Sequence, residues 1–259
     1  MVLTDEQQAT FHDQGFLVFP RYFTDDELVG YKADMDVVQA QREAKKPSPY
    51  LCQLPHLGKL IVHPKTLSIV EEVMGPGFAF HHLHASRQGA GTPGSNWHQD
   101  YEQEPQTNRS HGMVHVFYYF NGLNGEVGDL VVLPRTQKTV IANGALSHLG
   151  QQVLPGEIVV DNLPPGSAVL VYSALWHARR AKPGGEDRVR YFADASYCQA
   201  GVKWPSYHNV QWREILAAAR ENLGHESLFA EEHFFDVRAG KAAWRERQGS
   251  LVLDILPTV

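Results

Sequence analysis

The sequence is poor in cysteine, in positive charge and in long apolar runs. Its two cysteines, Cys52 and Cys198, lie far apart and show no metal-binding spacing, which argues against a disulfide framework or a zinc knuckle. The formal net charge of −6 argues against a general binder of nucleic acid or of membrane surfaces, because both need a basic face. We therefore expect a small molecule as the binding partner.

Signals for membrane insertion or export are also missing. No apolar run reaches the roughly 18 residues that a membrane span needs, and the opening MVLTDEQQ has no basic segment leading into an apolar one. We expect no membrane contact and a cytoplasmic location; the sequence carries no signal for an oligomeric state. A length of 259 residues with 43% hydrophobic and 20% charged residues fits one large globular domain.

The first part of the chain carries helix-start signals. Two pairs, Thr4 with Gln7 and Thr24 with Glu27, are typical of capping boxes, in which side chains satisfy the first backbone N–H groups of a helix. A strand is expected in GFLVFP between the first two helices. Helices are predicted over residues 3–14, 24–44 and 64–75, the last with Pro64 in its first turn and Gly75 at its end.

The pattern changes at about residue 78. Short apolar or alternating runs, broken by Gly, Pro and Asn, continue to residue 199 and predict the strands of a β-sandwich or barrel. Helical periodicity returns in VQWREILAAARENLG, residues 210–224. The chain is therefore predicted to be mainly β with helices around it.

The stretch GSNWHQDYEQEP, residues 94–105, suggests a metal site. If residues 97–101 are extended, His98 and Asp100 point to the same face of a sheet and one ion can contact both. A third ligand is offered by His177 in SALWHARR, which follows an apolar strand pattern. Two imidazoles and one carboxylate suit non-haem Fe(II) and leave coordination positions open.

Two arginines follow the third candidate ligand. Arg188 comes eleven residues after His177, and Arg190 shares its face if the segment DRVRYF is a strand. A guanidinium can hold a carboxylate by two parallel hydrogen bonds, so either arginine could anchor a dicarboxylic cosubstrate. The pattern leaves both open, and the spacing favours Arg188.

Taken together, these segments resemble the phytanoyl-CoA dioxygenase family of Fe(II)- and 2-oxoglutarate-dependent oxygenases. The resemblance covers roughly the first 200 residues through LTDEQQATFHDQGFLVFPRYFTDDEL, PGSNWHQD, NGEVGDLVVLPRTQK and LWHARRAKPGGEDRVRYF. It implies a double-stranded β-helix, a jelly-roll or cupin-like barrel with flanking α-helices. It also implies Fe(II), 2-oxoglutarate and O2 as cofactor and cosubstrates, with metal ligands His98, Asp100 and His177 and with Arg188 on 2-oxoglutarate.

The same resemblance implies hydroxylation, with desaturation as the other outcome left open, at an unactivated C–H bond, with release of succinate and CO2. The size of 29 kDa and the lack of a CoA or acyl-carrier signature favour a small metabolite as the substrate. We expect one catalytic domain over residues 1–259, made of a helical part packed on the barrel, a jelly-roll core and a C-terminal helical extension: residues 1–77, 78–199 and 200–259. Two other classes remain as alternatives. One is a cupin-type metalloenzyme that is not an oxygenase, such as an isomerase, and the other is a catalytically silent jelly-roll that binds a ligand.

The chain departs from the family pattern at two places. Many relatives carry a small hydroxyl two residues after the distal histidine, where this chain has Arg179. Where relatives often read PGSH, this chain reads PRTQ, so Thr136 keeps the hydroxyl while Arg135 and Gln137 are new. A different substrate would explain these changes, and so would drift.

Several other side chains have a functional and a structural interpretation. His82 and His84 in HHLH share a face and could bind a metal, but no glutamate follows, so we interpret them as barrel-lining or core residues. The run VHVFYYF is interpreted as core packing, with Tyr118 or Tyr119 reaching the cavity, and Trp97 as a packing residue. The candidates for substrate or supporting contacts are Arg87, Gln99, Tyr101, Tyr118, Thr136, Arg179 and Arg190.

A basic cluster after the distal histidine supports one sharper hypothesis. Arg179, Arg180 and Lys182 could lie at the mouth of the metal site and bind an anionic head group of the substrate. The competing interpretation is that these are solvated loop charges.

Overall fold

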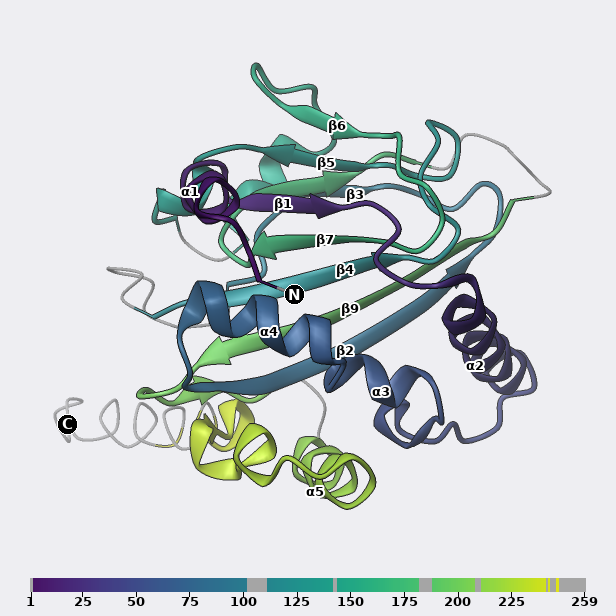
Figure 1. The fold of residues 1–259 in the computed structure, drawn as a ribbon, viewed down its shortest axis with the longest axis vertical. Helices are drawn as coiled ribbons and strands as arrows, with labels where there is room; N and C mark the ends of the chain where they lie inside the picture. Colours follow the sequence, from purple (N-terminus) through teal and green to yellow (C-terminus); the bar gives the residue numbers. More distant parts are fainter. Residues whose placement is uncertain are drawn as a thin grey trace, which may run out of the picture.

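Two antiparallel β-sheets, with helices covering the larger one, form the centre of the molecule (Figure 1). The computed structural model describes residues 2–101, 111–141, 144–181, 188–207 and 211–240, together with Ala242 and Glu246. The helices are α1 Asp5–Gln14, α2 Asp25–Glu43, α3 Leu57–Ile61, α4 Pro64–Met74 and α5 Trp212–Leu223. Short 3-10 turns lie at Leu51–Gln53, Thr136–Lys138, Ala145–Leu149, Glu226–Phe229 and Glu231–His233.

The strands divide into a large sheet, a small sheet and one short pair. The large sheet has the order β1-β7-β4-β9-β2, with bounds Phe16–Phe19, Ser167–Tyr172, Met113–Tyr119, Arg190–Gln199 and Phe78–Gln88. The small sheet has the order β3-β8-β5-β6, with bounds Ser95–His98, Trp176–Arg179, Leu130–Leu133 and Ile158–Val160. Strands β10 and β11, Trp204–Pro205 and Phe234–Phe235, form a separate parallel pair.

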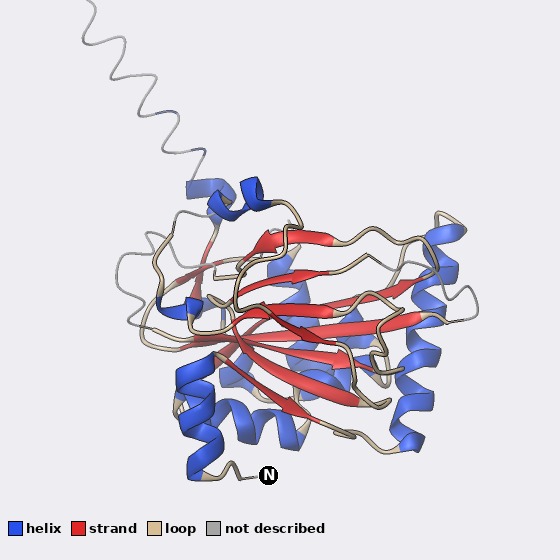
Figure 2. Cartoon of the chain, turned by 90° about the horizontal axis from the view of Figure 1, so that it is seen from above, coloured by secondary structure: helices blue, strands red, loops and turns tan. Residues whose placement is uncertain are grey.

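The two sheets pack face to face, as Figure 2 shows from above. Between them lies an apolar cluster to which β4 gives Phe117, β5 gives Leu130 and β7 gives Val169. Alternation along β4 separates its two faces: His115, Phe117 and Tyr119 face the other sheet, and Tyr118 faces the helices. The inner face of the large sheet can therefore present polar side chains to a cavity between the sheets.

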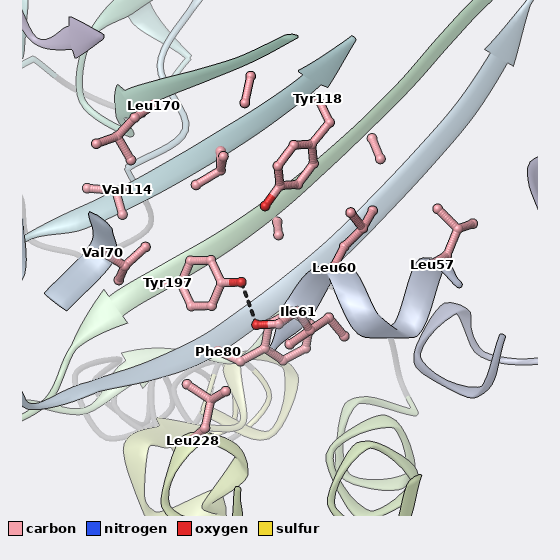
Figure 3. Close-up of a cluster of buried hydrophobic side chains, with 14 of the residues drawn as sticks. Leu57, Leu60, Ile61, Val70, Phe80, Val114, Tyr118, Leu170, Tyr197 and Leu228 are labelled. Atoms are coloured by element: carbon pink, nitrogen blue, oxygen red, sulfur yellow. Dashed lines mark hydrogen bonds between the residues drawn. The ribbon is translucent and has the colours of Figure 1, made fainter. Parts of the chain in front are cut away.

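The outer face of the large sheet is closed by helices. Its cluster joins Phe80, Tyr118 and Tyr197 of the strands to Ile61 and Val70 of α3 and α4 (Figure 3). The hydroxyl of Tyr197 donates a 2.7 Å hydrogen bond to the main-chain oxygen of Ile61, and that of Tyr118 bonds Thr66 at 2.9 Å. Both phenol groups are thus satisfied inside the core, which favours one rigid arrangement of helices and sheet.

Local sequence signals predicted these helices correctly. Both capping boxes are present, with Thr4 and Thr24 each accepting from the backbone three residues on. Gly15 ends α1 at φ 89°, a conformation that favours glycine. The expected helices over residues 3–14, 24–44, 64–75 and 210–224 appear as α1, α2, α4 and α5, and the GFLVFP strand appears as β1 at the edge of the large sheet.

Short elements without a strong pattern were not predicted. They include α3, β6 and the β10–β11 pair. Both cysteines are buried and unpaired. Among the described helices, none combines the length and the apolar character needed to cross a lipid bilayer.

Candidate active site

A histidine pair on neighbouring strands forms the base of the candidate metal site. His98 ends β3 and His177 lies in β8, and the antiparallel register pairs these two residues directly. Cross-strand partners project to the same side of a sheet, so their rings lie together, with centroids 4.2 Å apart. The alternation of β8 also places Ala178 in the core behind the sheet and His177 in the cavity.

The carboxylate of the site comes from the loop after the strand. The sequence interpretation had His98 and Asp100 on one continuous strand, but β3 ends at His98. Asp100 is held instead by its backbone N–H, which donates to the oxygen of Ser173 at 2.7 Å. Its Oδ2 lies 3.2 Å from Nε2 of His177 and its Oδ1 lies 3.7 Å from Nε2 of His98. The three side chains therefore converge, although His98 and Asp100 do not lie on one continuous strand.

Main-chain carbonyl groups orient both imidazoles. Nδ1 of His98 lies 2.7 Å from the oxygen of Asn96, and Nδ1 of His177 lies 3.0 Å from that of Leu175. A carbonyl only accepts, so each Nδ1 carries the hydrogen and each Nε2 points at Asp100. This is the arrangement in which a histidine ligates a metal through one nitrogen while the other is held by the protein.

The electrostatics of the site favour a cation between these atoms. Burial lowers the pKa of His98, helped by the neighbouring His177. Burial also opposes charge on His177 and Asp100, yet their mutual attraction and hydrogen bond raise the pKa of His177 and hold that of Asp100 far below its ordinary value. The pocket thus stabilises positive charge beside a carboxylate, and this donor set fits a divalent ion such as Fe(II).

A cavity of about 440 Å³, the metal cavity, opens above the triad. Arg190 lines one end of it. Arg190 is only 4% exposed, and burial lowers its pKa to about 10, so it remains charged near neutral pH. Its guanidinium lies over the ring of Phe192 at 4.6 Å, and Nη1 donates to Gln88 at 3.0 Å. In the described part of the chain it forms no ion pair, and its Nε is buried without an acceptor.

Arg188 lies elsewhere. Its side chain is 62% exposed, it lies 4.0 Å from the carboxylate of Glu126, and it is not among the described residues that line the metal cavity. The difference follows from the strand: β9 begins at Arg190, which pairs with Gln88, and Arg188 precedes it. Of the two arginines that the sequence left open, Arg190 is therefore the one that the fold brings to the metal triad.

Two members of the basic cluster after the distal histidine are engaged in structural contacts. Arg179 lines the cavity, but it donates to Gln88 at 2.6 Å and to the oxygen of Pro93 at 2.7 Å. Arg180 pairs with Glu157. Lys182 lies outside the described residues.

Most of the other candidate residues lie away from the cavity. Arg87 is on the outer side of β2 and pairs with Asp36 at 2.9 Å. Tyr101 packs on Trp204 and donates to the oxygen of His111, and Tyr118 lies in the outer core. Two further side chains, Gln99 and Thr136, bond to the main-chain oxygens of Ile141 and Leu133.

The PRTQ departure has a structural explanation. Arg135 pairs with Asp13 at 2.8 Å, and the side-chain amide of Gln137 donates to the main-chain oxygens of His12 and Asp13. Thr136 accepts from the backbone N–H of Trp176, at the start of β8. The segment thus fastens α1 to the strand that carries His177 and does not reach the cavity.

Sequence reasoning missed part of the cavity lining. His115 on β4, Asp194 on β9 and Tyr207 line it, as do the histidines at 82 and 84, which the sequence analysis had interpreted as barrel-lining. Tyr119 lines it too, so it and not Tyr118 faces inward. The sequence signal that could have identified these residues is the alternation along β4 and β9. It places Arg190, Phe192 and Asp194, for example, on one face of β9.

Comparison with known proteins agrees with this architecture. No curated protein matches the sequence. Among solved structures, HygX from Streptomyces hygroscopicus with nickel and 2-oxoglutarate bound is similar at 17% identity and a TM-score of 0.65, over 79% of this chain and 90% of that one. The non-haem alpha-ketoglutarate-dependent carbocyclase SnoK from nogalamycin biosynthesis is similar at 16% identity and a TM-score of 0.63, over 81% and 88%.

EctD from S. alaskensis with bound Fe is similar at 16% identity and a TM-score of 0.61, over 80% of this chain and 81% of that one. These likenesses confirm the predicted double-stranded β-helix with flanking helices. At the level of sequence, the family model for phytanoyl-CoA dioxygenase (PhyH) matches residues 11–188. This match spans most of the chain, including the metal triad, and the chain therefore belongs to the phytanoyl-CoA dioxygenase family.

Proposed function

We propose that this protein is an Fe(II)- and 2-oxoglutarate-dependent dioxygenase that hydroxylates an unactivated C–H bond of a small metabolite. The observation that carries the proposal is the pairing of a two-histidine, one-carboxylate triad with a buried arginine in one cavity. Burying a guanidinium without a carboxylate partner is unfavourable, so Arg190 calls for an anionic ligand. A dicarboxylic cosubstrate that reaches from the metal to Arg190 meets that need.

Each residue has a defined part in this proposal. His98, Asp100 and His177 would hold Fe(II) through two Nε2 atoms and a carboxylate oxygen. Arg190, steadied by Gln88 and the ring of Phe192, would bind the distal carboxylate of 2-oxoglutarate by charge-assisted hydrogen bonds. With Fe(II), 2-oxoglutarate and O2 bound, the centre would supply the oxidation of a substrate C–H bond, with release of succinate and CO2.

The protein's own contribution is orientation and exclusion of water. Phe117 packs on the ring of His177, with centroids 5.5 Å apart, and together with Phe192 gives the cavity an apolar wall. Such walls strengthen the pairing of charges and hold reactants in place. The hypothesis of an anionic substrate head group on Arg179 and Arg180 is not favoured, because both already have protein partners.

Spectroscopy and product analysis test the proposal together. Fe(II) and then 2-oxoglutarate are added anaerobically to wild type and to His177→Ala, and succinate is measured after O2 and ascorbate are supplied. Bidentate chelation of Fe(II) should give a weak visible charge-transfer band in the wild type, followed by slow formation of succinate. His177→Ala, checked for folding by circular dichroism, should show neither signal.

The alternatives give different results in the same experiment. A cupin-type isomerase or a silent binding protein would bind metal without a 2-oxoglutarate-dependent band. A folded, iron-loaded wild type that shows neither band nor succinate would therefore contradict the proposal.

A further inference from the structure

The end of the metal cavity opposite Arg190 has different chemistry. It is lined by His82, Asp194 and Tyr207. The two arginines of the cavity, Arg179 and Arg190, both donate to Gln88 and so lie together at the other end. If 2-oxoglutarate occupies the arginine end, as proposed above, the substrate is left with the end that carries a carboxylate.

Hydrogen-bond directions fix the protonation of His82. Nε2 of His81 lies 2.9 Å from the main-chain oxygen of Pro205, which only accepts, so this Nε2 carries the hydrogen. His81 is 6% exposed, and a neutral ring with its hydrogen on Nε2 has Nδ1 as an acceptor. That Nδ1 lies 2.8 Å from Nδ1 of His82, so the hydrogen between them belongs to His82.

The other ring nitrogen of His82 is therefore an acceptor. Burial, reinforced by the neighbouring His81 and His115, lowers the pKa of His82 well below its ordinary value, so the ring is neutral. Its single N–H is on Nδ1, which also lies 2.9 Å from Oγ of Ser196. Nε2 is left with a lone pair that points into the cavity.

A second acceptor faces this lone pair. Oδ1 of Asp194 lies 3.9 Å from Nε2 of His82 and accepts a 2.9 Å hydrogen bond from Nδ1 of His115. Within the described ranges, Oδ2 of Asp194 has no hydrogen bond, and no lysine or arginine pairs with this carboxylate. Among the contacts of the described residues, no donor lies between these two acceptors, one of which is charged, and this is unfavourable unless a ligand supplies a donor.

We propose that the substrate carries a protonated amine, and that this ammonium group binds between the carboxylate of Asp194 and Nε2 of His82. An ammonium offers three donors and a positive charge, which match a carboxylate and a neighbouring lone pair. A hydroxyl offers one donor and no charge, and a carboxylate would be repelled. The inference rests on the proposed function, since it assigns the arginine end to 2-oxoglutarate.

The neighbouring cavity indicates what the amine is attached to. A cavity of about 260 Å³ shares His82, His84 and Tyr207 with the metal cavity, and its wall includes Phe80, Ile215 and Leu216. Tyr207 stacks on the ring of His82, with centroids 4.1 Å apart, where the two cavities meet. An aliphatic or aromatic skeleton attached to the amine fits this mainly apolar space.

Matched probes test the amine directly. Anaerobic Fe(II)–2-oxoglutarate protein is titrated calorimetrically with pairs of equal skeleton: hexylamine and hexanol, cyclohexylmethylamine and cyclohexylmethanol, 2-phenylethylamine and 2-phenylethanol. In at least one pair the amine should bind about tenfold or more tightly than the alcohol. Asp194→Asn should abolish this preference, and Asp161→Asn, which removes an exposed carboxylate, should keep it.

Three outcomes would overturn the proposal: no amine that binds, equal binding of amine and alcohol in every pair, or a preference that survives Asp194→Asn. A failure of the proposed function can be distinguished from these outcomes, because the charge-transfer band would then be absent before any probe is added. The same side chains could instead hold a second metal. To test this, Ni²⁺ binding is measured in His177→Ala and in the double variant His177→Ala, Asp194→Asn. If the single variant binds one Ni²⁺ per chain and the double variant binds none, the second cluster is a metal site and the proposed amine site is contradicted.

Discussion

Two clusters of two histidines and one aspartate share the metal cavity, and they differ in where their hydrogens lie. In the first, Nε2 atoms lie 3.2 and 3.7 Å from the oxygens of Asp100. In the second, ring nitrogens of His115 and His82 lie 2.9 and 3.9 Å from Oδ1 of Asp194. Residue types and distances are nearly the same, so neither can assign the two sites.

The contacts behind each cluster separate them. Main-chain oxygens take the Nδ1 hydrogens of His98 and His177, so each Nε2 is left to ligate a metal held beside Asp100. In the second cluster, His115 donates to Asp194 itself and already satisfies one of its oxygens. The first cluster thus offers three metal ligands, whereas the second offers acceptors for a hydrogen-bond donor.

The largest expected effect is a difference in metal binding between matched aspartate variants. Asp100→Asn removes a charged ligand and should weaken Fe(II) binding by more than about 100-fold. Asp194→Asn should retain about one Fe(II) per chain, because this carboxylate is not a ligand in the first cluster. Elemental analysis after anaerobic gel filtration gives the occupancy, and loss of iron from both variants would mean that the two clusters act as one site.

The two arginines provide the next comparison. Arg190→Gln should raise the KM for 2-oxoglutarate about 100-fold, since it leaves the distal carboxylate buried and unpaired. Arg190→Lys keeps the charge but not the two parallel hydrogen bonds, so it should recover part of the loss. Arg188→Gln should change the KM less than about threefold, because this side chain lies at the surface. The KM is measured from succinate formation.

The reverse order of effects, with Arg188→Gln the more damaging, would restore the assignment that spacing favoured. Equal small effects from both variants would mean that 2-oxoglutarate is held by other groups. The charge-transfer band, titrated with 2-oxoglutarate in each variant, separates loss of binding from loss of turnover.

These arginines also mark how far sequence could predict the site. The triad was found because its residues lie in short motifs that fix their local geometry: His98 and Asp100 are two residues apart, and His177 closes an apolar strand. The choice between Arg188 and Arg190 depends instead on where β9 begins and on its register with β2. That register is set by pairing with residues about a hundred positions away, which spacing within one motif cannot reveal.

The proposed amine site, at the end of the metal cavity opposite Arg190, shows the same limit of prediction from sequence. His82, His115 and Asp194 come from three strands and have no common motif. Alternation places each on an inner face, but the protonation of His82 depends on Pro205 through His81, across 124 positions of the chain. Helices and caps were predictable because their signals are local, whereas this cluster is created only when the strands assemble.

The smallest expected effect concerns the pH dependence of stability, where the two clusters have opposite signs. The pKa of His177 is raised by Asp100, whereas that of His82 is lowered by burial. Unfolded His82 titrates near 6.5, so as pH falls below 6.5 the unfolded chain binds a proton that the folded chain excludes, and stability falls. Between pH 7 and 5.5 the free energy of unfolding of wild type should therefore fall by about 1 kcal/mol more than that of His82→Gln.

Urea unfolding of the metal-free protein measures the difference, with His148→Gln, an exposed histidine variant, as the control that should follow wild type. Parallel curves for wild type and His82→Gln would show that folding does not favour neutral His82, and the acceptor assigned to its Nε2 would lose its basis.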